Sequence, residues 1–130
     1  MGRFILRYME QTLYDSRGRA TAYIADDGET IYTWKGHAVA YLVDDKVYGW
    51  KGKHIGWFVD GVIYDGSGRR AGFLSGKSPV AVYASPAKYA KYARYAKYAR
   101  YAPHARRALS TATSSVGLET LLKSNAVGGV

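Results

Sequence analysis

The chain has 130 residues, of which 48% are hydrophobic, and it carries a formal net charge of +9 and no cysteine. This length indicates one small domain, and the lack of cysteine excludes disulfides and thiolate metal ligands. No apolar run approaches the roughly 20 residues that cross a bilayer. Arg7 also interrupts the short apolar patch of the N-terminus before a signal-peptide core forms. We therefore expect a cytoplasmic protein without a cofactor.

A leader, residues 1–10, precedes the first repeated unit. Its segment Arg3 to Arg7 has two interpretations. It is either an additional edge strand or an artefact of an upstream start, in which case Met9 begins the native chain. The sequence does not choose between them.

Four copies of one pattern follow between residues 13 and 74. Each copy reads aliphatic, Tyr, three variable residues, Gly, three variable residues, a small residue, an aromatic and another apolar residue. The copies begin at Leu13-Tyr14, Ile31-Tyr32, Val47-Tyr48 and Ile63-Tyr64, and their glycines are Gly18, Gly36, Gly52 and Gly68. A unit this short cannot bury its own apolar face, so the copies must pack on one another.

Each copy predicts a β-hairpin, because glycine accepts the positive φ of a tight turn. Along the returning strand of the first copy, Ala22 and Ile24 share one face while Tyr23 lies on the other. The first and last copies lack polar caps, and closing the ring removes exposed strand edges. We therefore predict a mainly β fold with four tandem hairpins in residues 11–78, arranged around a pseudo-fourfold axis.

The excess positive charge lies in the next segment, residues 79–108, which we call the arm. Seven successive triplets run from Lys88 to Ala108, and most of them read Lys or Arg, Tyr, Ala. Ser85-Pro86 favours a helix from about Pro86 to Ala102, since Ala, Lys and Arg are strong helix formers. A period of three lags an α-helix by about 60° per triplet, however, whereas a threefold extended conformation aligns equivalent residues in stripes. Both conformations stay open.

Two functions fit the arm. In the first, its tyrosines pack on the hairpins or on a partner subunit while its cations stay solvated; these tyrosines are Tyr89, Tyr92, Tyr95, Tyr98 and Tyr101. In the second, its cations neutralise a nucleic acid or another anionic surface while the tyrosines stack on bases. The candidate cations are Lys88, Lys91, Arg94, Lys97, Arg100, Arg106 and Arg107. We favour the first, because no recognised nucleic-acid-binding fold accompanies the triplets.

Nothing in the sequence indicates an enzyme. The histidines His37, His54 and His104 form no matched metal set, and Gly66 to Gly68 reads as a turn because it lacks the Lys-Ser/Thr of a phosphate-binding loop. One aromatic residue from each hairpin is a ligand-binding candidate for a small molecule or carbohydrate, although we favour the alternative that these residues fill the core. These four residues are Tyr23, Tyr41, Trp57 and Phe73.

The last segment, residues 109–130, predicts a short amphipathic helix from Ser114 to Lys123 with Ser115 as its cap. Its apolar face needs a partner, either the hairpins or a second chain, so we also consider a homo-oligomer. The leucines of that face are Leu118, Leu121 and Leu122. The final stretch, Ala126 to Val130, is expected to be loose.

The four Tyr-x-x-x-Gly hairpins, followed by the triplets and the segment Gly117 to Leu122, resemble the bacterial 4-fold β-flower family. The resemblance covers most of the chain from about Met9 onward. It implies four hairpins arranged as petals around a pseudo-fourfold axis, in a family of uncharacterised function. No catalytic residue can be carried over from it. We therefore expect a non-enzymatic binding or assembly module.

Overall fold

The computed structural model describes residues 8–130, so the proposed leader strand Arg3 to Arg7 lies outside the described residues. Regular structure consists of β-strands over residues 11–73, a single 3₁₀ turn and a short C-terminal helix. The elements are β1 (Gln11–Tyr14), β2 (Ala20–Ile24), β3 (Thr30–Thr33), β4 (Ala38–Val43), β5 (Lys46–Gly49), β6 (His54–Val59), β7 (Val62–Asp65), β8 (Arg70–Phe73), η1 (Ser75–Lys77) and α1 (Leu118–Lys123).

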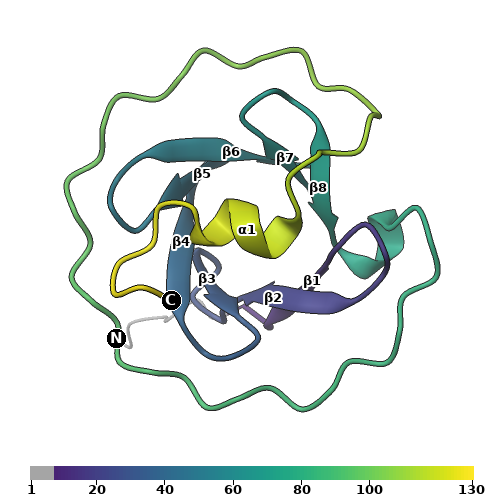
Figure 1. The fold of residues 1–130 in the computed structure, drawn as a ribbon, viewed down its shortest axis with the longest axis horizontal. Coiled ribbons are helices and arrows are strands. Elements are labelled where there is room, and N and C mark those ends of the chain that lie inside the picture. Colours follow the sequence, from purple (N-terminus) through teal and green to yellow (C-terminus); the bar gives the residue numbers. More distant parts are fainter. Residues whose placement is uncertain (1–7) are drawn as a thin grey trace, which may run out of the picture.

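The strands form a closed antiparallel barrel in which each strand pairs with its neighbour in sequence and β8 returns to β1 (Figure 1). The four repeated units are the hairpins β1–β2, β3–β4, β5–β6 and β7–β8, which we call petals 1 to 4. This confirms the predicted mainly β class and the closure of the ring. Closure is stabilising because it pairs the backbone groups that an open edge would leave exposed.

Tight turns end every petal, as the sequence predicts. At the outer tips, Gly36 and Gly52 adopt φ values of 97° and 91°, in the region that glycine tolerates best. Between petals, Asp44 and Asp60 also adopt positive φ, 54° and 50°. Asp27 caps its turn differently, since its carboxylate accepts the backbone N–H groups of Glu29 and Thr30 at 2.9 and 2.8 Å.

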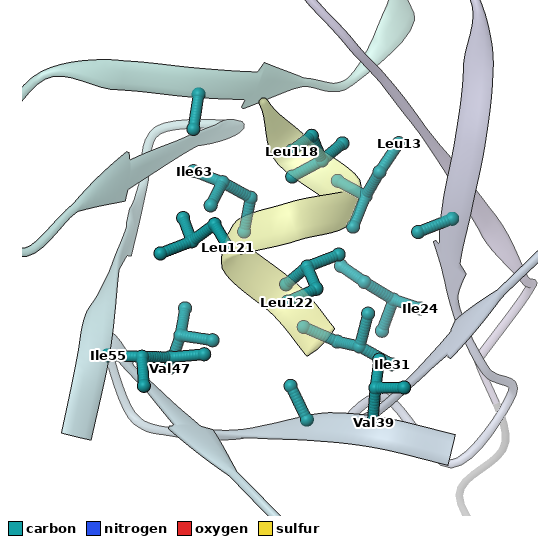
Figure 2. Close-up of a cluster of buried hydrophobic side chains, with 13 residues drawn as sticks. Leu13, Ile24, Ile31, Val39, Val47, Ile55, Ile63, Leu118, Leu121 and Leu122 are labelled. Atoms are coloured by element: carbon teal, nitrogen blue, oxygen red, sulfur yellow. The ribbon is translucent and has the colours of Figure 1, made fainter. Parts of the chain in front are cut away.

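The inner face of the barrel is aliphatic and carries the main core. The aliphatic residue that opens each repeat is fully buried there in all four petals; these residues are Leu13, Ile31, Val47 and Ile63. Helix α1 lies across the barrel axis, and its leucines complete the same cluster (Figure 2). Leu118, Leu121 and Leu122 are 1, 7 and 0% exposed. The idea that they bind a second chain is therefore wrong, because this chain's own barrel already covers them.

The C-terminal segment differs from its prediction at both ends. The helix begins at Leu118 with Gly117 as its N-cap and no side-chain cap, rather than at Ser114 with Ser115 as cap. The Ser114 hydroxyl instead bonds the carboxylate of Asp65 on petal 4. The tail is also less loose than expected, since Ala126 and Val130 pack against the core cluster. These contacts fix α1 in the barrel without help from a local cap.

Candidate functional site: the arm and the outer face of the barrel

The outer face of the barrel is aromatic, because side chains alternate between the two faces of each strand. At every junction between neighbouring petals, one aromatic residue from each petal forms a cross-strand pair. The pairs are Tyr23–Tyr32, Tyr41–Tyr48, Trp57–Tyr64 and Tyr14–Phe73. The rings of the first two pairs are stacked, with centroids 5.5 and 5.8 Å apart. The junctions therefore repeat one arrangement around the barrel.

The four aromatic residues that the sequence suggested as a ligand site occupy these junctions. Tyr23, Tyr41, Trp57 and Phe73 are between 1 and 3% exposed. They belong to three separate buried clusters. The structure thus places them at equivalent positions, one at each junction, but does not bring them together around one cavity.

The arm encircles the barrel and passes the petals in turn, as Figure 1 shows for the segment that runs from teal to yellow-green. It meets each petal at the same backbone group, the carbonyl of the tip glycine. Residues spaced by nine donate their N–H to these carbonyls, each at 2.9 Å: Tyr83 to Gly18, Tyr92 to Gly36, Tyr101 to Gly52 and Ser110 to Gly68. Each petal therefore takes nine residues of the arm.

Nine residues are three triplets, which accounts for the strict period of the sequence. Residues 81–110 contain no helix and no strand, so the helical alternative for Pro86 to Ala102 is wrong. In a conformation that repeats every three residues, as polyproline II does, equivalent side chains return to the same side at every petal. An α-helix would instead rotate them around its axis.

The tip glycines also permit the close approach of the arm. A Cβ atom on Gly36 would lie 2.2 Å from the carbonyl oxygen of Ala90, and one on Gly52 would lie 2.1 Å from that of Ala99. Both distances are far inside van der Waals contact. The glycines therefore serve two purposes, a positive φ for the turn and space for the arm backbone.

Two lysines of the arm lie against boxes of three aromatic rings, which we call the Tyr-Tyr-Trp boxes. Lys88 Nζ lies 4.4 Å from the ring centroid of Tyr23 and 5.8 Å from that of Trp34, and Tyr32 completes this box. Nine residues later, Lys97 Nζ lies 4.3 Å from Tyr41 and 5.5 Å from Trp50, beside Tyr48. An ammonium group over a ring face is attracted by the ring quadrupole.

The indoles of the boxes also hold the arm backbone. Trp34 Nε1–H donates to the carbonyl of Pro86 at 3.2 Å, and Trp50 Nε1–H donates to that of Tyr95 at 2.7 Å. The two carbonyls are again nine residues apart. Each box therefore binds the arm twice, through a cation and through a backbone acceptor.

Other arm cations contact rings or carboxylates of the barrel side. Lys91 lies 5.2 Å from the Tyr32 centroid, and Arg94 and Arg100 lie 5.7 Å from those of Tyr32 and Tyr48. The ion pairs are Lys88 and Lys91 with Glu10, Arg94 with Asp27, and Arg106 with Asp45. The hydrogen bond from Lys88, with that from Lys91, lowers the pKa of Glu10.

The tyrosines of the triplets remain largely exposed, although the ring of Tyr92 stacks on that of His37 with the centroids 4.3 Å apart. Tyr89, Tyr92, Tyr95, Tyr98 and Tyr101 are 61, 58, 55, 52 and 70% exposed. The expectation that this stripe packs on the petals while the cations stay solvated is therefore wrong for the stripe as a whole, since every tyrosine stays more than half exposed. The rings that line the outer face of the petals instead hold cations of the arm, as Lys88 over Tyr23 and Lys97 over Tyr41 show.

His54 is a structural residue of the third junction. Its Nδ1 accepts the backbone N–H of His104 at 2.9 Å, and its Nε2 lies 2.8 Å from the carbonyl of Gly56. Burial lowers its pKa, which favours the neutral ring that this pair of bonds requires. Within residues 8–130, no three His, Asp or Glu side chains gather closely enough to hold a metal ion. In the same part of the chain, no helix is long and apolar enough to cross a membrane.

Four repeated hairpins closed into a barrel, with a helical plug inside and an encircling arm outside, define a pseudo-fourfold all-β flower. A family model for the 4-fold beta flower protein matches residues 11–122, from the first strand to the leucines of α1. The chain therefore belongs to the 4-fold beta flower family. No curated protein and no solved structure matches it.

Proposed function

We propose that this chain is a non-enzymatic binding module in which the barrel is the scaffold and the arm is the contact surface. The observation that supports this is the stripe of five tyrosines along the arm, each more than half exposed. Exposed aromatic side chains repeated along one surface are typical of interaction sites. Here they stand on a backbone that hydrogen bonds fix to every petal tip.

The partner that fits this belt is an acidic protein surface. The arm, residues 79–108, carries seven Lys and Arg residues and no Asp or Glu, within a chain of net charge +9. A second copy of the chain would bring the same positive charge, which disfavours self-association through the belt. Tyrosine side chains contribute large contact areas at low entropic cost, and the net positive charge of the chain steers an acidic partner.

Nucleic acid is the second candidate, because the arm combines exposed tyrosines with a high density of cations, the two residue types that bind single strands. The shape of the arm argues against it. Proteins that bind single strands track the backbone in a groove, whereas this belt runs around the outside of the barrel. The third candidate, a small molecule or carbohydrate on the petal aromatics, competes with Lys88 and Lys97, which already lie over those rings.

The test replaces the rings of Tyr89, Tyr98 and Tyr101 by Ser together, because the backbone N–H of each bonds a petal carbonyl and survives the change. The matched control replaces the same three by Phe. Each protein is used to capture partners from a nuclease-treated extract of the native host. We expect an acidic protein that the wild type and the Phe variant retain and the Ser variant loses.

Two results would overturn the proposal. One is equal capture of the partner by the Ser and Phe variants, which would show that the tyrosine rings do not contribute to binding. The other is nucleic acid as the material retained without nuclease. In that case affinity should fall with salt, with a log-log slope of roughly −0.7 per phosphate on single strands.

A further inference from the structure

The four junctions are not equally filled, although the backbone repeats. Trp34 and Trp50 each stand two residues after the tyrosine of their petal, where their indoles bind the arm. The equivalent residue of petal 4 is Gly66. The third junction therefore lacks the indole that would reach the arm at His104, nine residues after Tyr95.

A cleft of about 730 Å³ lies at this third junction, between petal 3, the tip of petal 4, the arm and the end of α1. The corresponding space at the second junction, beside His37 and Tyr95, measures about 10 Å³. Trp50 and Val127 pack there in one cluster. The cleft is therefore open where Gly66 takes the place of a tryptophan and where no residue of the C-terminal tail lines the space, as Val127 and Val130 do at the second junction.

His54 replaces the missing indole in part. Its ring meets Trp57 edge to face at 4.8 Å, as Trp50 meets Tyr41 at 5.7 Å. An imidazole is smaller than an indole, so the space is not closed. The ring of His104 stacks on His54 at 5.6 Å and forms part of the wall.

The walls of the cleft carry basic side chains and no acidic one. Lys53, Arg106 and Arg107 line it together with the two imidazoles, and none of its lining residues is Asp or Glu. Arg106 is held in place by Asp45, whose carboxylate oxygen lies 3.1 Å from its guanidinium. Consecutive arginines at one rim, with a lysine in the same cleft, favour an anion with several acceptor oxygens.

We propose that this cleft binds a small molecule that carries a phosphate group. Its volume falls within the 300 to 1,000 Å³ that is typical of small-molecule sites. Guanidinium forks match phosphate oxygens in geometry as well as in charge. The site is separate from the tyrosine belt, because it opens between the arm and the barrel rather than on the outward side of the arm.

The test measures thermal stability and the His104 imidazole NMR signals of the full chain with three probes: inorganic phosphate, AMP and adenosine. A ligand that binds the folded state alone raises the unfolding temperature as its concentration rises. We expect both phosphates to do so and to shift the His104 signals, and AMP to bind more tightly. Adenosine should have no effect. Binding of adenosine as tight as that of AMP would overturn the proposal, as would no response to either phosphate.

Three variants locate the binding. Lys53→Gln combined with Arg107→Gln should weaken phosphate and AMP binding at least tenfold, whereas Lys35→Gln, which removes a charge outside the cleft, should leave it unchanged. Equal losses of affinity in the double variant and in Lys35→Gln would show that binding depends on overall charge, and would overturn the proposed site.

Gly66→Trp restores the residue of the other boxes and should abolish binding. The substitution is sterically open, because the nearest heavy atom to a Cβ there is the Ile55 carbonyl oxygen at 3.9 Å. Retained binding in a folded Gly66→Trp protein would also contradict the proposal. If that variant does not fold, the charge variants decide the question.

Discussion

The inner and outer faces of the barrel are both covered by the C-terminal part of the chain, but by different forces. Inside, α1 inserts Leu118, Leu121 and Leu122 among aliphatic residues, and full burial of a leucine contributes about 1.5 to 3 kcal/mol. Outside, the arm places half-exposed cations over rings, each worth about 0.5 to 1 kcal/mol. The plug therefore supplies stability, whereas the arm supplies a regular surface that we expect to open before the core does.

The largest effect is expected at the plug. Leu122→Ala removes a side chain that is 0% exposed in the barrel, and the cavity left behind should cost about 3 kcal/mol of unfolding free energy. Val116→Ala, at a residue that is 38% exposed, is the matched control and should cost less than about 0.5 kcal/mol. Urea denaturation measures both. Equal effects would show that α1 does not belong to the core.

The second prediction tests whether the tip glycines serve the arm as well as the turn. Gly36→Asn and Gly61→Asn both place an asparagine at positive φ, which this residue tolerates. At Gly36 the new Cβ meets the Ala90 backbone oxygen at 2.2 Å, whereas at Gly61 it meets the flexible Lys77 side chain at 2.8 Å. We expect Gly36→Asn to cost about 2 kcal/mol and Gly61→Asn well under half of that. Limited proteolysis should show the arm of Gly36→Asn cut first.

Much of the fold could be predicted from the sequence because its signals are local. The period of two put Ala22 and Tyr23 on opposite faces of the sheet, and the glycine of each repeat marked its turn. The orientation of the arm could not be predicted, because a threefold segment has three equivalent stripes and only the surface it meets decides which faces inward. The replacement of Trp by Gly66 could have been found by aligning the repeats, whereas the match of nine residues to one petal could not, because the triplets carry no marker of that length.

A third prediction measures the outer contacts. Lys97→Met keeps the length and apolar stem of the side chain but removes the ammonium that lies 4.3 Å from the Tyr41 centroid. The unfolding free energy should fall by about 1 kcal/mol. Lys51→Met is the matched control, since Lys51 lies in an exposed petal tip. A double-mutant cycle with Trp50→Leu should give a coupling free energy of about 0.5 kcal/mol or more. A coupling of zero would show that this box does not hold the arm through Lys97.

A fourth prediction concerns the pH dependence of the third junction. Burial lowers the pKa of His54, so the unfolded chain binds the proton more tightly than the folded one. The stabilisation by neutral His54 is therefore fully present above about pH 6.5, the ordinary histidine pKa, and is lost as the pH falls toward the folded pKa. His104, Lys46 and Asp45 are the charged or titratable neighbours that set this pKa. Thermal unfolding of His54→Gln should show a flatter pH profile than that of His37→Gln.

The smallest effect is expected at Glu10, which lies just before β1. Its carboxylate pairs with two arm lysines, Lys88 and Lys91, that lie about eighty residues later in the sequence. Its side chain is 30% exposed, so solvent screens the pairs and Glu10→Gln should cost about 0.5 kcal/mol. The stabilisation by Glu10 is lost as the pH falls, as for His54, but the cause differs, because hydrogen bonds from Lys88 and Lys91 lower the pKa of this carboxyl. The stabilisation is present above the ordinary glutamate pKa and disappears as the pH falls through the lower folded value.

Thermal unfolding at about pH 6 should distinguish Glu10→Gln from the wild type, and about 1 M salt should bring the two unfolding temperatures together. A difference that persists in high salt would show that Glu10 acts through packing rather than through charge. The arm would then be held by packing, as the inner plug is, rather than by its cations.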